Sequence, residues 1–451
     1  MTFNKRCIIN HKATYLFMKH SVTILLISGL FALVFMGCKN EVISTDPTHD
    51  TTKLWPAFDN TTEKWGYINE KGKMVIPAQY DEVHGFSCGY ACVHKDGQIH
   101  YIDPSGAIQA SMEGNEDFYY FYNLGYDFHY DYVVVKKDDK YGLMNKKFEY
   151  VVQPSYLEVG NMSSSGLAVV RDYRKNADQG TTASGYINTK GEIAIPCRYD
   201  YALPFVDGYA IVMGDTRHDC GVINTSGEYV INPGEYYLSY VGGEMFAFQR
   251  NNNYGFGLLN SKGEILSDPA ANVEYEPAVD NELIGVSNTQ EKFGYMDFSR
   301  NMKIDYQFDY VMPFYEGYAF VEVEEGDEDI VKVIDTKGKV VYTLPLWSEP
   351  ETGFHNGLAL IVVETDDDYR YRYITPQGET VYEWKEPDID IPCSPVRKLS
   401  ERYTMAGTEQ ALHASETGRM NSMEEFTAQT KHFSSARHER RHKHACDPGI
   451  D

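Results

Sequence analysis

KWGYINEKGKMVIPAQYDEVHGFSCGYACV, residues 64–93, is the unit that this chain repeats. Residues 65–69 are rich in aromatic and β-branched side chains, which predicts a strand. An Asn followed three residues later by Gly predicts a tight turn at 69–72, because Asn suits the first position and Gly the last. Residues 73–76 then predict the return strand, and within 86–93 the apolar run 90–93 after Gly89 predicts a third strand.

Four positions in this unit carry most of the structural information. Gly66 lies inside the first strand, where Gly usually marks a bulge or the close approach of another backbone, and Trp65 would cover the bare site. Gly72 lies in the turn, where Asn is expected to be a tolerated replacement. Pro77 donates no backbone hydrogen bond, so the ladder should stop there or become an edge. Apolar residues on both faces favour small sheets stacked face to face.

The unit recurs with spacings of 34 to 43 residues, a period typical of repeat architectures. Nine copies are recognised, and the Gly66 position is filled in turn by Gly66, His100, Gly142, Gly185, Gly221, Gly257, Gly294, Lys332 and Arg372. The three copies without Gly are expected to be less regular. Each copy buries too little surface alone, so neighbours must complete it. The predicted fold is all-β, a tandem repeat of short antiparallel units. The array is an open solenoid or superhelix, or a propeller-like closed ring; the uneven spacings favour the open array.

The order of the recurring residues resembles a known family. Aromatic-Gly-aromatic-Ile-Asn, then Gly, Val-Ile-Pro, Tyr-Asp and Gly-Tyr-Ala follow one another as in the bacterial WG (or KWG) repeat. The resemblance covers about residues 55–384, although only Lys64-Trp65-Gly66 matches the name literally. It implies a repeat protein without a shared catalytic residue.

The N-terminal residues predict export and lipidation. Residues 1–37 are predicted to be a leader and signal peptide, because 22–37 is an uncharged apolar run that is short for a membrane span. Gly37-Cys38 resembles the cleavage site of bacterial lipoproteins, which implies a lipid on Cys38; an uncleaved signal anchor is the alternative. The polar residues 38–54 predict a flexible tether. The expected location is the bacterial cell envelope, lipid-anchored to the outer membrane or the cell surface.

Composition separates a repeat domain, 55–384, from a tail, 385–451. Aromatic residues nearly vanish in the tail while His and Arg accumulate, so it is predicted to be disordered or weakly helical. The chain carries a formal net charge of −25, and the acidity belongs to the repeat domain. An acidic surface argues against nucleic-acid partners.

The cysteines offer two candidate sites. Cys88 and Cys92 could suggest a metal or a disulfide, but on one strand their Cα atoms would lie ~13 Å apart, too far to bridge. They are interpreted as small buried residues. Cys197 and Cys220 fall in adjacent copies and could pair.

Three further patterns could carry chemistry. The acidic runs 322–329 and 366–368 could bind Ca²⁺, but they lack EF-hand spacing and are predicted to be solvated loops. Residues 438–442 formally match HExxH, but in a polar context and with Pro448 at the place of a third ligand. Rows of Tyr and Trp could stack on sugars, although packing between repeats explains them better. No metal, cofactor or catalytic residue is predicted.

These observations predict a non-catalytic protein. The expected function is a cell-envelope lipoprotein that acts as a binding or scaffold module for protein or glycan partners, since repeat arrays present long surfaces with variable loops. The only membrane contact expected is the lipid. The alternative is an envelope hydrolase whose site is assembled from loops of different repeats.

Overall fold

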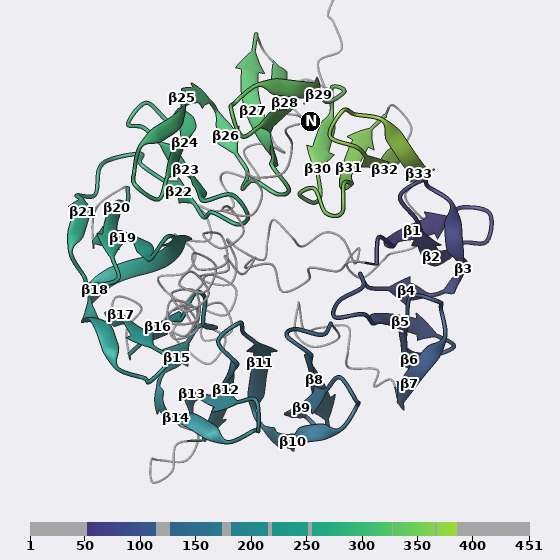
Figure 1. Cartoon of the computed structure of the whole chain (residues 1–451), viewed down its shortest axis with the longest axis horizontal. Helices are drawn as coiled ribbons and strands as arrows, with labels where there is room; N and C mark the ends of the chain where they lie inside the picture. Colours follow the sequence, from purple (N-terminus) through teal and green to yellow (C-terminus); the bar gives the residue numbers. More distant parts are fainter. Residues whose placement is uncertain are drawn as a thin grey trace, which may run out of the picture. The chain divides into compact units, whose positions relative to one another are not determined.

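The computed structural model describes residues 52–113, 127–173, 182–214, 219–250, 255–326, 328–365 and 368–385. The described residues contain strands and turns and no helix. Nine small antiparallel sheets, here called blades 1 to 9 in chain order, form a ring (Figure 1). The prediction of an all-β repeat fold with nine copies is confirmed. None of the described residues forms a helix that is long and apolar enough to cross a membrane.

The blades follow the chain without interruption. Blades 1 to 3 contain β1 (Trp55–Asp59), β2 (Lys64–Ile68), β3 (Met74–Tyr80); β4 (Glu82–Val83), β5 (Ala91–Lys95), β6 (Gln98–Ile102), β7 (Ile108–Glu113); and β8 (Tyr132–Lys137), β9 (Lys140–Asn145), β10 (Tyr150–Tyr156). Blades 4 to 6 contain β11 (Glu158–Met162), β12 (Leu167–Tyr173), β13 (Thr182–Asn188), β14 (Ile193–Tyr199); β15 (Tyr201–Ala202), β16 (Tyr209–Met213), β17 (Asp219–Asn224), β18 (Tyr229–Gly242); and the end of β18 with β19 (Met245–Arg250), β20 (Gly257–Asn260), β21 (Ile265–Ser267).

Blades 7 to 9 contain β22 (Tyr275–Glu276), β23 (Leu283–Ser287), β24 (Phe293–Asp297), β25 (Met302–Phe308); β26 (Tyr310–Val311), β27 (Tyr318–Glu325), β28 (Glu328–Asp335), β29 (Val340–Thr343); and β30 (Ser348–Pro350), β31 (Ala359–Glu364), β32 (Tyr369–Ile374), β33 (Thr380–Lys385). In a four-stranded blade the first strand lies nearest the centre of the ring and the last lies outside (Figure 1). The long strand β18 is the outer strand of blade 5 and the inner strand of blade 6.

The repeat recognised in the sequence is out of phase with the blade. β2 and β3 are the last two strands of blade 1, whereas β5, predicted as the third strand of the same unit, is the second strand of blade 2. The stretch 64–93 therefore spans one junction between neighbouring blades. This is why apolar residues lie on both faces of its strands.

The predicted tight turn is confirmed in atomic detail. The Asn69 Oδ1 accepts the backbone N–H groups of Lys71 and Lys73 at 3.0 and 3.1 Å, and the Gly72 N–H donates to the Asn69 carbonyl at 2.9 Å. Gly72 has φ +72°, the left-handed conformation. The same side-chain cap closes turns in other blades, at Asp103, Asn145, Asn188, Asn224, Asn260 and Asp335.

Gly66 faces the close approach of another backbone, as predicted. A Cβ placed there would lie 2.5 Å from the Ile76 carbonyl oxygen and 2.8 Å from the Ala78 nitrogen. Trp65 pairs with Tyr80 and Tyr67 with Ile76, so three residues of β3 bulge opposite one glycine. Pro77 lies in this bulge, on the edge strand. The same crowding by the outer strand occurs at Gly142, Gly185, Gly221, Gly257 and Gly294.

The three copies that lack this glycine differ in the outer strand. His100 pairs directly with Ser111, Lys332 with Thr343 and Arg372 with Glu383, and the wide bulge is absent at these three positions. The expectation that these copies are the irregular ones is therefore wrong for the strand pairing: they have the straighter ladder. A side chain and the wide bulge exclude each other, because the bulged backbone occupies the space of the Cβ.

The turn glycine has a second role that the sequence did not reveal. A Cβ on Gly72 would lie 2.1 Å from the carbonyl oxygen of Val381 in blade 9, and one on Gly191 would lie 2.7 Å from that of Val151 in blade 3. The turn of one blade is thus pressed against the outer strand of the preceding blade. The expectation that Asn would be tolerated at Gly72 is wrong, since the site has no room for a side chain.

Apolar clusters between neighbouring blades hold the ring together, and they include the junction between the last blade and the first. There the Tyr373 hydroxyl donates to the Pro56 carbonyl at 2.9 Å, and the Lys385 N–H donates to the Asn60 Oδ1 at 2.9 Å. The ring is closed, so the inference of an open array from uneven spacings is wrong. Variable loop lengths absorb the uneven spacing.

Candidate functional site

A cluster of polar side chains lies on the inner strands of blade 2. Glu82 is on β4 and His84 follows it by two residues; Cys92 and His94 are alternate residues of β5. Glu82 is paired with His94 across the ladder, and Val83 with Val93. Because side chains alternate along a strand, the four polar side chains share one face and the two valines the other.

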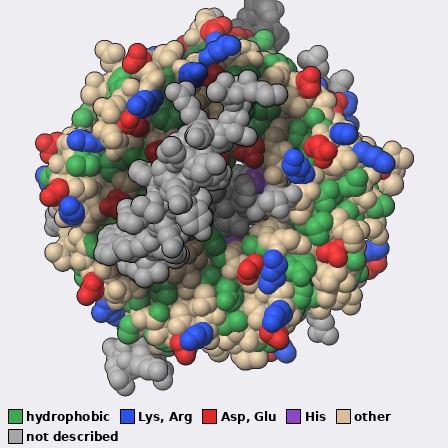
Figure 2. All heavy atoms as spheres, in the orientation of Figure 1, with side chains coloured by type: hydrophobic (Ala, Val, Ile, Leu, Met, Phe, Trp, Pro, Cys, Tyr) green, Lys and Arg blue, Asp and Glu red, His purple; other side chains and the backbone are tan. Residues whose placement is uncertain are grey.

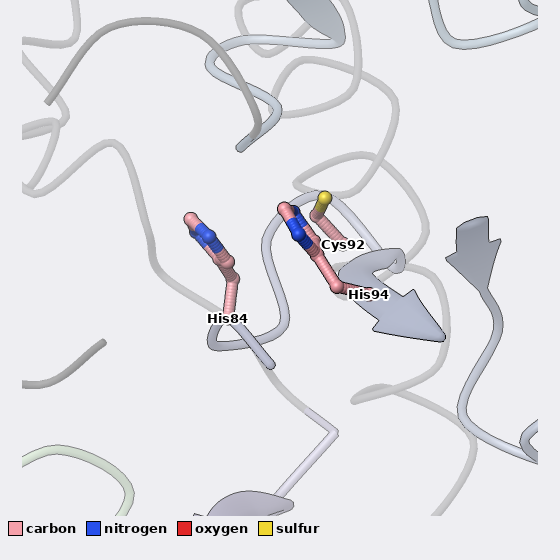
Figure 3. Close-up of side chains that lie close together, drawn as sticks. All are labelled: His84, Cys92 and His94. Carbon is pink, nitrogen blue, oxygen red and sulfur yellow. The ribbon is translucent and has the colours of Figure 1, made fainter. Parts of the chain in front are cut away.

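The histidine and cysteine side chains converge (Figure 3). One ligating atom each of His84, Cys92 and His94 lies within 4.8 Å of the other two. The two imidazole rings are stacked, with 6.4 Å between centroids and 16° between planes. The histidine side chains are 21% and 25% exposed, whereas Cys92 is 1% exposed. Figure 2 shows histidine side chains in the hollow at the centre of the ring.

A carboxylate contacts one ring nitrogen of each histidine. The Asp127 Oδ1 lies 3.1 Å from the Nδ1 of His84, and the Glu82 Oε2 lies 3.5 Å from the Nδ1 of His94. Asp127 comes directly before Phe128, which packs in the apolar cluster between blades 2 and 3. The site therefore draws on three chain segments and two blades.

Burial dominates the electrostatics of the cluster. It lowers the pKa of His94 from 6.5 to about 4, and the neighbouring His84 acts in the same direction. Burial raises the pKa of the Glu82 carboxyl, with His84 opposing the shift. It also raises the pKa of the Cys92 thiol well above its usual range. Nucleophilic cysteines are partly exposed and have lowered pKa values, so Cys92 does not have the setting of a catalytic thiol.

The other repeats show what is particular to blade 2. In blade 2 and in four other blades, the tripeptide Gly-Tyr-Ala or Gly-Leu-Ala lies at the start of the second strand. The Ala of this tripeptide, Ala91 in blade 2, aligns the five strands. The position of Cys92 is then filled by Val169, Ile211, Phe320 and Leu360, and that of His94 by Arg171, Met213, Glu322 and Val362. In these four blades the Cys92 position is apolar and the His94 position holds no histidine. Packing of the repeat therefore does not require the polar set of blade 2.

The residues singled out from the sequence have structural roles or lie elsewhere. Trp65 is buried and packs edge-on against Phe58 and Trp384, and the motif glycines face the outer strands. Cys38 and the HExxH-like residues 438–442 lie outside the described residues, as does most of the second acidic run. The first acidic run was predicted as a loop, but it forms the ends of β27 and β28 around a short turn.

No disulfide joins the cysteines that the structure describes, so the bond between Cys197 and Cys220 that the sequence left open is not formed. Cys88 stays outside the histidine cluster, whereas Cys92 belongs to it. The partner of Cys92 is His94 on the same strand, together with His84, and not Cys88. The signal that sequence reasoning missed is a pair of alternate polar residues, Glu82-x-His84 and Cys92-x-His94, on what should be two neighbouring strands.

The fold defines a class: a closed nine-bladed β-propeller with one sequence repeat per blade. Its repeats match a known family model, described as "WG containing repeat", at residues 65–98, 141–175, 185–213 and 293–325. The chain therefore carries WG repeats, as the resemblance implied.

No curated protein matches the sequence. Among solved structures, "Structure of apo AztD from Citrobacter koseri" matches with a TM-score of 0.35 and 10% identity, over 65% of this chain and 93% of that one.

Proposed function

We propose that this protein is a bacterial cell-envelope lipoprotein whose propeller is a non-catalytic binding or scaffold module for protein or glycan partners. The observation that supports this is that the recurring residues of the repeat serve packing, whereas its connections vary. The residues that recur, such as the strand glycine and the capping Asn, lie in strand and turn packing. The connections between strands differ in length between copies and lie at the two ends of the ring, where ligands of repeat proteins bind.

The hairpin between β27 and β28 is the most distinctive connection. Its strands are longer than in most blades and carry a dense set of exposed carboxylates, Glu324, Glu325, Glu328 and Asp329. Such a projection favours a partner with a basic surface, because opposite potentials steer association. A basic protein segment is therefore the preferred partner.

Binding can be tested with a matched pair of charge variants. The full-length mature protein is used in a pull-down from envelope extracts and on a glycan array. Replacing the four hairpin carboxylates by their amides is expected to weaken capture at least tenfold. The control replaces four carboxylates at the other end of the strands with amides. They accept hydrogen bonds from the Asn side chains that cap the turns, and they are Glu149, Glu192, Glu228 and Glu264.

Equal loss in both variants would show that net charge, and not the hairpin, governs binding. Capture of neither protein nor glycan, together with turnover in a hydrolase screen that a single carboxylate variant abolishes, would favour the alternative function, an envelope hydrolase.

Lipidation at Cys38 is a separate expected result. The apolar run 22–37 ends in Gly37-Cys38, the pattern that precedes a lipidated cysteine. Mass spectrometry of the membrane fraction from the native host should find an acylated N-terminal peptide beginning at Cys38. A Cys38→Ser variant should appear in the soluble fraction or keep its leader. A mature N-terminus at another residue would contradict the proposal.

A further inference from the structure

We propose that blade 2 contains a site for a transition-metal ion of the Zn²⁺ class, bound by the imidazoles of His84 and His94 and the thiolate of Cys92. The site is independent of the partner-binding surface proposed above, and it departs from the sequence-based expectation of no metal. The inference rests on the convergence of three ligating side chains, two from β5 and one from the residue directly after β4.

The donor set selects the class of ion. Imidazole nitrogen and thiolate sulfur bind Zn²⁺, Co²⁺ and copper, whereas Ca²⁺ and Mg²⁺ require oxygen ligands. In a tetrahedral site with Zn–N near 2.0 Å and Zn–S near 2.3 Å, ligand atoms are separated by roughly 3.5 Å. The three ligating atoms already lie within 4.8 Å of one another. Small side-chain rotations would therefore bring them into coordination distance.

The surroundings resemble those of known metal sites. A histidine that binds a metal through one ring nitrogen usually donates the other N–H to a carboxylate, which fixes the ring and makes it a better ligand. The Asp127 carboxylate lies 3.1 Å from the Nδ1 of His84 and the Glu82 carboxylate 3.5 Å from the Nδ1 of His94, so both are placed beside the ring nitrogen that would not bind the ion. The Glu82 Oε1 is also 3.9 Å from the Nε2 of His84, so this carboxylate lies beside both histidines.

Burial of the thiol is compatible with this role. A metal ion deprotonates a thiol that ligates it, which replaces the proton by a stronger positive charge. The partly exposed histidines leave a route to solvent on one side, while the apolar cluster between blades 2 and 3 covers Cys92 on the other. The ion would thus link β5 to the residue that follows β4, beside the junction with blade 3.

Cobalt is the probe, because Co²⁺ bound by a thiolate shows a sulfur-to-metal charge-transfer band. The full chain, reduced and stripped of metal, is titrated with Co²⁺ and then with Zn²⁺. We expect one equivalent of Co²⁺ to give the band, Zn²⁺ to displace it, and a hundredfold excess of Ca²⁺ or Mg²⁺ to leave it unchanged. Cys92→Ser should remove the band, and His84→Ala should weaken Co²⁺ binding at least tenfold.

Two cysteine controls locate the site. Cys88→Ser changes a neighbouring thiol outside the cluster and should keep the band. Cys446→Ser tests the histidine-rich tail, where Cys446 follows His442 and His444. Circular dichroism of each metal-free variant checks that it folds.

Three outcomes would overturn the proposal: no thiolate band, a band that survives Cys92→Ser, or a band lost in Cys446→Ser. If Cys92→Ser fails to fold, the His84→Ala variant at the partly exposed histidine decides, since unchanged Co²⁺ affinity there would exclude the site.

Discussion

Replacing Trp384 by Ala is expected to lower the free energy of unfolding by about 3–5 kcal/mol, the usual cost of deleting a buried tryptophan side chain. Trp384 lies on β33 and is 3% exposed. Its ring stacks on Tyr371 at 5.5 Å and meets Trp65 of blade 1 edge-on at 6.0 Å. The substitution therefore removes apolar contacts within blade 9 and across the junction that closes the ring.

Trp347→Ala is the matched control, because it deletes the same side chain from a site that is 47% exposed. Its effect should be below about 1 kcal/mol, as for most exposed substitutions. Denaturant titration of both variants, followed by tryptophan fluorescence and circular dichroism, measures the difference. Equal stability of the two variants would mean that the junction between blades 9 and 1 contributes little to the closed ring.

Replacing Gly66 by Val is expected to cost about 3 kcal/mol, at the upper end of the range for overpacking. The reason is the 2.5 Å between the position of the new Cβ and the Ile76 carbonyl oxygen. A flexible side chain could move away, but here the obstacle is the backbone of the bulge itself. β3 would have to give up its bulged pairing with β2 to admit the branched side chain.

The repeat supplies its own control for this substitution. Lys332 holds the same place in blade 8, where it pairs with Thr343 in a straight ladder, and Val suits such a strand position. Lys332→Val loses a partly exposed ion pair with Glu325, worth less than about 1 kcal/mol. Thermal melts of both variants decide the matter. A Gly66→Val protein as stable as the Lys332→Val protein would refute the packing role of the glycine.

Much of the architecture could be predicted from the sequence because its causes are local. The nine copies, the capped turn at Asn69 and the close approach at Gly66 all follow from residue types at fixed spacing. Ring closure could not be predicted, because it depends on contacts such as Tyr373 with Pro56, 317 positions apart. The crowding at Gly72 was missed for the same reason: the backbone that presses on it belongs to the other end of the chain.

The candidate site was missed for a different reason. His84 and Cys92 are separated by a connection whose path the sequence does not determine, and Asp127 enters from the next blade. The sequence shows Cys92 and His94 alternating with Ala91 and Val93 along β5. Cys92 nevertheless fits a small core residue as well as it fits a member of a polar cluster. Only the register between β4 and β5, which places Glu82 opposite His94, shows that the four polar side chains share one face.

The closing junction also sets a problem for synthesis. Within the described residues, each blade is made of consecutive strands and none shares a strand across the junction of blades 9 and 1. As the chain leaves the ribosome, eight junctions can form in order. The aromatic face of Phe58 and Trp65 must wait for Trp384, one of the last strand residues made. Until then that face is open to aggregation or to a chaperone, so the earliest blade is the last to be protected.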